Sequence, residues 1–399
     1  MIPKNVKIRS AWGVLLSMPL LLLVSLQQVQ AAALNAVDDV ALVALYNTTG
    51  GASWTNSSGW SGTTGVMDTV TNPPNGVTFD GSGRVTQISL GFNNMVGDIS
   101  ALDLSGLSST TTLTFNNNSM SGSLPAATQL PSGLQTLNLG SNQMNGSFPD
   151  YTGLTALITL QLYSNLFSGN LPDAAKFPST IETINLGGNQ YSGDFVDYSI
   201  LPQLKWIFLS NNQLSGTPPS AALLPNTIQG LSLSSNQLTG TIPNYSTLTA
   251  LGTLHLYYNQ LTGSLPTAAQ LPPSISSLAL YNNQLSGIFP DYSTLTNLSI
   301  LYLYNNQLDG NLPSVAQLPS GLTDLILSTN SFTGTVPDYS GLSLLYFGLE
   351  QLNVQGPTPS GLLALSGTGV MTTTPAIDPA LDGSYVAAAV IPVTGTGGK

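Results

Sequence analysis

Hydrophobic and polar positions follow one frame along most of the chain. Between Leu251 and Pro266 this frame reads L-x-x-L-x-L-x-x-N-x-L-x-G-x-L-P, and close copies stand before and after it. The leucines of its first part alternate with other residues, which predicts a β-strand with one face turned inward. The copies recur every 23 or 24 residues, apart from a first interval of 25. A period of this length predicts a solenoid in which stacked coils share one core.

One asparagine keeps its place in the frame through eleven copies. It stands where the chain turns off the predicted strand. There its amide can bond main-chain groups of the turn and of the next coil, which are otherwise buried without partners. We therefore predict an internal structural column and not a ligand site. Its members are Asn93, Asn118, Asn142, Asn165, Asn189, Asn212, Asn236, Asn259, Asn283, Asn306 and Asn330.

Twelve repeats are predicted over residues 85–356. In the last copy Leu352 takes the place of the asparagine while Gly356 is kept. A degenerate unit of this kind is typical of a C-terminal cap. Residues 34–84 precede the repeats, and we interpret them as an N-terminal cap, because an open solenoid end exposes apolar core and unpaired strand edges.

The predicted cap begins with a helix over residues 35–50. Asp38 and Asp39 fall in its first turn, where carboxylates suit the helix dipole, and Gly50-Gly51 ends it. The period of the apolar residues predicts one buried face for this helix. That face is expected to consist of Val37, Val40, Ala41, Ala44 and Leu45.

Alternate repeats match one another at an interval of 47 residues. One type carries a tyrosine after its proline, usually preceded by an aspartate. Because this position lies outside the strand, we predict that the tyrosines pack on the convex side and that the aspartates form turns. Consecutive aspartates are two coils apart, about 10 Å, so they are not expected to share a metal ion. The tyrosines are Tyr151, Tyr198, Tyr245, Tyr292 and Tyr339.

The two ends of the chain differ from the repeats. Residues 1–33 combine a basic start, an apolar stretch over residues 11–26 and small residues, which predicts a cleaved export signal. The alternative is an uncleaved membrane anchor, although the stretch is shorter than the roughly 20 residues of a spanning helix. No later stretch predicts a membrane span. Residues 357–399 predict a flexible Gly/Pro/Thr-rich tail. Within it, residues 391–395 are similar to the LPxTG sorting signal without a hydrophobic segment after it, so an incomplete chain and a chance match are both open.

Charge is scarce and mostly negative. Only 6% of the residues are charged, and the formal net charge is −11. With so few Lys and Arg, nucleic acids and anionic membranes are not expected partners. The absence of cysteine excludes disulfides, thiolate metal sites and a cysteine nucleophile. Because His255 is the only histidine and no acidic residue is expected beside it, we predict no catalytic residue, no metal site and no cofactor.

The frame resembles the plant-type leucine-rich repeat (LRR) family, whose consensus is LxxLxLxxNxLxGxIP. The match covers about 270 residues, and the cap is similar too, with Leu42 to Tyr46 followed by Gly50, Trp54 and Trp60. Plant members usually clamp this cap with a cysteine pair, so the chain is closer to the cysteine-free secreted microbial versions. The resemblance implies an α/β-type solenoid: a curved right-handed superhelix with a parallel concave β-sheet, a short second sheet and irregular or 3-10 segments elsewhere. It implies ligand binding and no catalysis.

Aromatic residues collect at outward positions of the predicted concave sheet, mainly from the sixth repeat onward. Exposed rings on a rigid sheet dominate binding hot spots, and with little charge nearby they suit a neutral glycan or the apolar anchor of a protein. The alternative is that tyrosines pair across adjacent strands and only stabilise the sheet. The candidate ligand-binding residues are Tyr163, Trp206, Phe208, His255, Tyr257, Tyr258, Tyr281, Tyr302 and Tyr304.

Three functional hypotheses follow from the sequence. The first is a secreted or surface-displayed binding protein that recognises an extracellular protein or a neutral glycan through its concave face. The second is a structural or adhesive cell-surface protein without a discrete ligand pocket. The third is binding of ice or a mineral surface by the flat Thr/Ser/Asn ladders. An enzyme is not expected.

Overall fold

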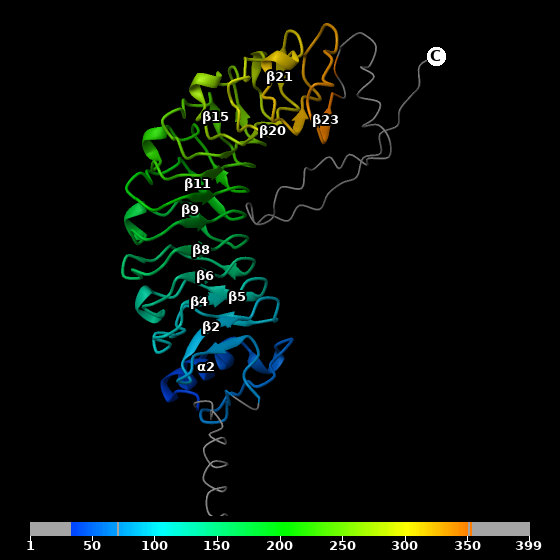
Figure 1. Ribbon diagram of the computed structural model, residues 1–399. Helices are drawn as coiled ribbons and strands as arrows, with labels where there is room; N and C mark the ends of the chain where they lie inside the picture. Colours follow the sequence, from blue (N-terminus) through cyan, green and yellow to red (C-terminus); the bar gives the residue numbers. More distant parts are fainter. Residues whose placement is uncertain (1–32, 70–71, 350–351, 353–399) are drawn as a thin grey trace, which may run out of the picture.

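The chain forms a single curved stack of coils (Figure 1). The computed structural model describes residues 33–69, 72–349 and 352. The predicted export signal, apart from Ala33, and the predicted tail over 357–399 lie outside the described residues. Among the described residues, no helix is both long enough and apolar enough to cross a lipid bilayer.

The concave side of the stack is one 13-stranded β-sheet. Its first strand is antiparallel to the second, and all later neighbours are parallel. The twelve strands from β2 onward correspond one to one to the twelve predicted repeats, including the degenerate last one. In spatial order the strands are β1 (Val77–Phe79), β2 (Val85–Ser89), β4 (Thr112–Thr114), β6 (Thr136–Asn138), β8 (Thr159–Gln161), β10 (Thr183–Asn185), β12 (Trp206–Phe208), β14 (Gly230–Ser232), β16 (Thr253–His255), β18 (Ser277–Ala279), β20 (Ile300–Tyr302), β22 (Asp324–Ile326) and β23 (Tyr346–Gly348).

Short strands on the flank confirm the expected second sheet. They follow the ladder asparagine in the first ten repeats and pair in parallel in four small groups. The groups are β3 (Val96–Asp98), β5 (Ser119–Gly122) and β7 (Gln143–Met144); β9 (Ser168–Asn170), β11 (Gln190–Gly193) and β13 (Gln213–Leu214); β15 (Thr239–Gly240) and β17 (Gln260–Leu261); and β19 (Ser286–Ile288) and β21 (Gln307–Asp309).

Single 3-10 turns complete alternate coils. They lie in the repeats that alternate with the tyrosine-bearing type. In three of them a glutamine side chain accepts from the main-chain N–H at the start of the turn, as Gln270 does from Thr267 at 2.9 Å. The turns are η2 (Ala127–Gln129), η3 (Ala174–Lys176), η4 (Ala221–Leu223), η5 (Ala268–Gln270) and η6 (Val315–Gln317), with η1 (Gly51–Ser53) in the cap.

The asparagine column is the internal tie that the sequence predicts. Asn236 donates from Nδ2 to the carbonyl oxygens of Leu233 and Ser234 in its own turn and to Leu209 of the preceding coil. Its Oδ1 accepts from the main-chain N–H of Leu214 at 2.9 Å. The same pattern repeats from Asn118 to Asn330. Each amide therefore satisfies buried main-chain groups of two coils at once.

The tyrosine column is structural, as predicted. Tyr245 is fully buried, and its hydroxyl donates to the carbonyl oxygen of Pro219 at 2.8 Å. The other four tyrosines make the same bond to the proline 26 residues earlier. The residue before each tyrosine forms a turn, because its side-chain oxygen accepts from the N–H two residues later, as Asp150 does from Thr152 at 2.9 Å.

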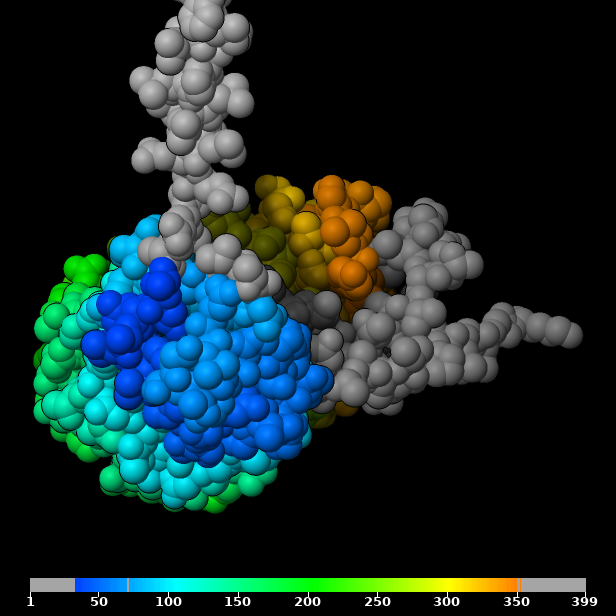
Figure 2. All heavy atoms as spheres, turned by 90° about the horizontal axis from the view of Figure 1, so that it is seen from below, coloured from blue at the N-terminus to red at the C-terminus, as the bar shows by residue number. Residues whose placement is uncertain are grey.

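The N-terminal cap covers one end of the stack, as the view onto that end shows (Figure 2). Its helix α2 (Ala36–Thr48) starts at Asn35, whose side chain accepts from the N–H of Val37. Trp54 and Trp60 lie edge to face at 4.9 Å and are buried beside it. The interior of the solenoid is thus closed on this side.

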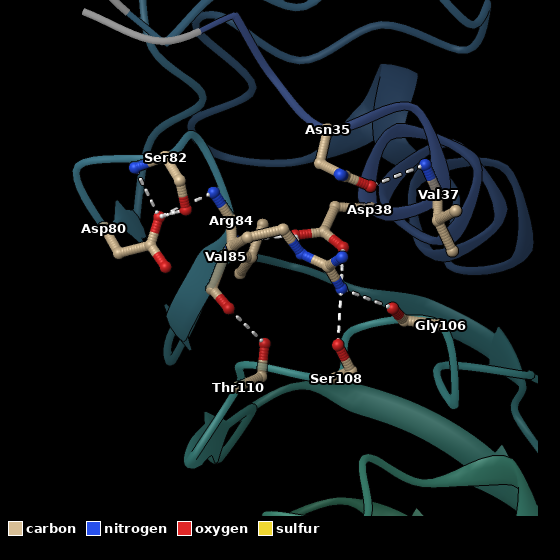
Figure 3. A network of polar contacts seen from close by, with 10 residues as sticks. All are labelled: Asn35, Val37, Asp38, Asp80, Ser82, Arg84, Val85, Gly106, Ser108 and Thr110. Atoms are coloured by element: carbon tan, nitrogen blue, oxygen red, sulfur yellow. Dashed lines mark hydrogen bonds and ion pairs between the residues drawn. The ribbon is translucent and has the colours of Figure 1, made fainter.

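The predicted buried face of the cap helix is wrong in part. Val37 and Val40 are exposed, while Asp38 and Asp39 are buried. The reason is an ion pair: a carboxylate oxygen of Asp38 lies 2.9 Å from a guanidinium nitrogen of Arg84, and its other oxygen accepts from the N–H of Val85 (Figure 3). The helix turns this carboxylate toward the first repeat, so the two valines face outward.

Candidate functional site

The nine predicted site residues all lie on or beside the concave sheet, but they form separate groups. Tyr257, Tyr281, Tyr302 and Tyr304 come together across repeats eight to ten. Trp206 and Phe208 lie on β12 as a parallel pair 6.0 Å apart. Tyr163 follows β8. The sequence predicts one continuous aromatic patch, and the structure divides it into these groups.

The largest group is a column of stacked tyrosines. Tyr281 lies between Tyr257 and Tyr304, with 4.3 Å between ring centroids on each side and nearly parallel planes. Tyr258 meets Tyr281 edge to face at 5.6 Å. This is the cross-strand pairing that the sequence left open as an alternative, because residues at the same position of adjacent parallel strands face each other across one strand spacing. The stack covers the ring faces of Tyr281 on both sides, and Tyr257 and Tyr281 are buried.

Five of the nine residues are buried, which corrects the expectation of exposed rings. Phe208, His255, Tyr257, Tyr281 and Tyr302 are each at most 8% exposed. Their outward positions were predicted correctly, but at these positions each ring packs against its neighbours. Tyr258 is 53% exposed, and Tyr163, Trp206 and Tyr304 are half-buried. The surface that a ligand can reach is therefore carried by these four rings.

Glycines on neighbouring strands place two of the accessible rings. The ring of Tyr163 lies over Gly140 of the preceding repeat, where an added β-carbon would stand 2.3 Å from Cε1. The indole of Trp206 lies over Gly230 of the following repeat, where a β-carbon would stand 2.3 Å from both Cε3 and Cζ3. Both rings thus rest on bare backbone, which fixes them along the sheet.

Between the Trp206–Phe208 pair and the stacked tyrosines, the sheet carries small polar residues. The hydroxyls of Ser210 and Ser232 lie 2.6 Å apart, and Ser234 donates to Ser210 at 2.8 Å. His255 bonds Ser277 through Nε2 at 3.1 Å, and its ring lies 6.0 Å from that of Tyr257. The histidine is thus held in a hydrogen-bonded position on the sheet.

Burial keeps the tyrosine hydroxyls protonated. It raises the pKa of Tyr281, and neighbouring tyrosines raise it further. Burial also raises the pKa of Tyr302, whose hydroxyl donates to Asp324 Oδ1 at 3.0 Å. For Tyr163, burial raises the pKa while hydrogen bonds from the Asn138 and Asn116 side chains act in the opposite direction. These hydroxyls therefore act as neutral hydrogen-bonding groups at ordinary pH.

Sequence reasoning missed three charged residues beside the sheet. Asp324 opens β22 and accepts from Tyr302. Glu182 and Lys205 stand at equivalent positions just before β10 and β12 and form an ion pair of 2.9 Å. The signal in the sequence is the frame itself, because its second and third positions also lie beside the concave sheet.

The outer side of the stack carries one further hollow. Its volume is about 450 Å³, and it lies beside Asp194, Phe195, Pro218 and Thr241. Pro218 stands where the other four repeats of the same alternating type have a leucine. Among the described residues, no group of three or more His, Cys, Asp or Glu is placed to hold a metal ion.

Comparison with known proteins places these features in context. A family model described as Leucine Rich Repeat matches residues 203–222 and 297–318. No curated protein matches the chain significantly. The plant peptide hormone receptor RGFR1, solved in complex with RGF2, is 27% identical, with a TM-score of 0.60 over 71% of this chain and 46% of that chain.

Two more solved structures share the fold. The LRR ectodomain of the Arabidopsis receptor kinase HAESA, in complex with an IDA peptide hormone, is 25% identical, with a TM-score of 0.56 over 70% of this chain and 52% of that chain. The chain thus spans about half the length of both receptor chains. A plant ice-binding protein is 23% identical, with a TM-score of 0.57 over 82% of this chain and 99% of that chain. At this identity the likeness concerns the fold alone.

Proposed function

The chain is a leucine-rich repeat protein of the plant type, and on this premise we propose that it is an extracellular binding protein that recognises an extended, uncharged segment of another protein along its concave sheet. The export signal predicted over residues 1–33 supports an extracellular location. The two receptor structures at 27% and 25% identity, each solved with a peptide, support a protein partner.

The observation that carries the proposal is the placement of three accessible rings. Tyr163, Trp206 and Tyr258 belong to repeats four, six and eight, and two of these rings are held over glycines. Four strand spacings separate the first repeat from the last, about 19 Å, which an extended peptide of about six residues covers. Trp206 stands at the third position of its repeat and Tyr163 at the seventh, which adds about 13 Å along the strand direction, so a segment that meets all three rings crosses the sheet obliquely and is longer than six residues. Rigid aromatic anchors give contact area at little cost in conformational entropy.

The charges near this surface favour a neutral segment. At the outward positions of the described repeats, Glu182 and Lys205 form an ion pair of 2.9 Å, and Asp324 accepts a hydrogen bond from the Tyr302 hydroxyl. A charged ligand finds no unpaired counter-charge beside the three rings. The hydroxyls and amides between them offer hydrogen bonds to a peptide backbone instead.

The stacked tyrosines favour a peptide over a glycan. A sugar ring needs an open aromatic face to lie on. The faces of Tyr281 are covered on both sides at 4.3 Å, and Tyr257 and Tyr304 are each covered on one side. Because Tyr257 and Tyr281 are also buried, the column offers a sugar ring little aromatic surface to lie on. The proposal therefore commits to protein recognition.

Selection of displayed peptides on the full chain tests this function. Enriched peptides are titrated by calorimetry against the wild type, Trp206→Ala, Tyr163→Ala and the control Ile288→Ala, an exposed apolar residue on the flank. We expect each concave variant to weaken binding by about tenfold or more, as at a hot spot, and the control to bind like the wild type. Enriched peptides that bind the concave variants unchanged contradict the proposal. A glycan-array signal lost in Tyr163→Ala, with no enriched peptide, replaces the protein partner by a glycan.

A further inference from the structure

The flank of the solenoid presents a second regular surface, distinct from the concave sheet. After each ladder asparagine, the first, third and fifth residues point outward while the residues between them turn toward the core. We call these outward residues the flank face. In repeats seven and eight they are Gln237, Thr239, Thr241, Gln260, Thr262 and Ser264, and all six are exposed.

Main-chain hydrogen bonds hold the flank face in register. Thr239 donates its N–H to the carbonyl of Gly216 at 2.8 Å, and Thr262 donates to Gly240 at the same distance. Gln237 and Gln260 make equivalent bonds of 2.8 Å to the preceding coils. Adjacent strands therefore stand about 4.8 Å apart, and outward neighbours on one strand about 6.6 Å apart. The side chains lie on a two-dimensional grid.

The hydroxyls of Thr239 and Thr262 are fixed in orientation. The Oγ1 atom of Thr239 donates to the carbonyl oxygen of Gly216 at 3.2 Å, and that of Thr262 donates to Gly240 at 3.4 Å. Each bond selects one side-chain rotamer, so the oxygen and the methyl group of each threonine recur in the same pose. A surface that is ordered before binding loses little side-chain entropy on contact.

Repeats six to eight of the flank face carry only Gln, Ser and Thr. The nearest charged members are Asp194 in repeat five and Asp309 in repeat ten. Protein interfaces are enriched in aromatic residues, Met and Arg and depleted in Ser, and nucleic acids need Lys and Arg. None of these enriched residues is present in this stretch. This stretch of the flank face therefore offers a ligand only uncharged hydrogen-bonding groups at regular intervals.

We propose that the flank face binds ice. A rigid grid of neutral hydroxyl and amide groups hydrogen-bonds to ordered water at every node, and a crystalline water surface is the ligand that offers partners at regular intervals in two dimensions. Three adjacent repeats give three rows of three such side chains. The concave sheet takes no part, so this site and the peptide site are independent.

The test uses the full chain and two matched double variants. Thr239→Lys with Thr262→Lys places two long cations on the flank face. Thr247→Lys with Thr294→Lys makes the same exchange at exposed positions beside the tyrosine column. Thermal hysteresis and partition into growing ice are measured for all three proteins, with circular dichroism melts to establish that each is folded.

The expected result is hysteresis and uptake into ice for the wild type and the second variant, with both lost in the first variant. Wild-type protein that stays in the liquid and shows no hysteresis overturns the proposal. Equal uptake of the first variant and the wild type also overturns it, because the ice contact then lies elsewhere. Should the first variant melt early, Thr239→Val with Thr262→Val repeats the test with side chains of nearly the same shape that lack the hydroxyls.

Discussion

Asn236 of the seventh repeat donates from Nδ2 to the carbonyl oxygen of Leu209 in the sixth repeat at 3.0 Å. The same amide closes the turn of its own coil through Leu233 and Ser234 and accepts from Leu214. This side chain joins the two coils together with the hydroxyls of Ser210, Ser232 and Ser234. Repeated along the stack, this bond makes the concave sheet a rigid support for the rings above it.

Replacing Asn236 by alanine is expected to lower the free energy of unfolding by about 3 kcal/mol, because it leaves the buried N–H of Leu214 without a partner and removes one of the two amide donors from the carbonyls of Leu209 and Leu233. Denaturant unfolding measures the loss. Asn226→Ala serves as control, since Asn226 is exposed, and should stay within about 0.5 kcal/mol of the wild type. Equal effects of the two substitutions contradict the role of the column.

Replacing Arg84 by methionine is expected to cost about 3 kcal/mol near pH 7, because the buried Asp38 carboxylate loses its partner. Burial raises the pKa of Asp38 above its usual value of 3.8. The folded state therefore binds the Asp38 proton more tightly than the unfolded chain does. The destabilisation that comes from burying the ionised Asp38 carboxylate grows as pH rises from 3.8 toward the raised pKa. Relative to Asp38→Asn, the Arg84 variant should recover stability on acidification. A difference between the two variants that does not change with pH rules out this explanation.

The turn aspartates should make the protein less stable in acid. Hydrogen bonds from the hydroxyl and the N–H of Thr152 lower the pKa of Asp150, and equivalent bonds from Ser199 lower that of Asp197. Their stabilisation is complete above the unfolded pKa of 3.8 and is lost as pH falls through the lowered folded values. The same holds for Asp291 and Asp338.

Asparagine at these four positions is expected to keep the turns, as Asn244 does naturally by accepting from Ser246 at 2.9 Å. The quadruple variant should fold normally at pH 7 and lose less stability than the wild type between pH 4 and about pH 2. Urea midpoints measured across this range provide the test. Parallel curves for the two proteins are the contrary outcome.

Replacing Gly230 by alanine is expected to displace the indole of Trp206, because the added methyl group occupies the space of Cε3 and Cζ3. The fluorescence emission of the variant should shift to longer wavelength as the ring turns into water, and affinity for a selected peptide should fall. Gly252→Ala is the matched control, since the nearest atom to its β-carbon is Ser276 Oγ at 3.5 Å. Identical emission spectra for both variants show that the ring does not depend on Gly230.

Much of the fold was predictable from the sequence, because each coil repeats one local solution. The leucine frame, the asparagine column, the tyrosine column and the turns before it all appear as predicted, since they depend on contacts at a fixed sequence interval. Asp38 was not predictable in this way. Its burial depends on Arg84, 46 residues away, and the period of the helix gave no sign of that pair.

The candidate site was predicted in position but not in exposure. The frame places Tyr257, Tyr281 and Tyr304 on the concave side, but whether a ring stands free or stacks depends on its rotamer and on the neighbouring strand. Tyr281 is covered because tyrosines stand on both sides of it, whereas Trp206 is accessible over a glycine. Reading each outward position across three adjacent repeats shows these neighbours in the sequence itself.

Acrylamide quenching of Trp206 tests most directly whether the concave sheet binds the ligand. In the part of the chain that the structure describes, the other tryptophans, Trp54 and Trp60, are buried in the cap, while Trp206 is half-buried on the sheet. A saturating selected peptide is predicted to reduce quenching in the wild type and to leave quenching unchanged in Trp206→Phe. A bound peptide that leaves Trp206 as open to acrylamide as before contradicts the account.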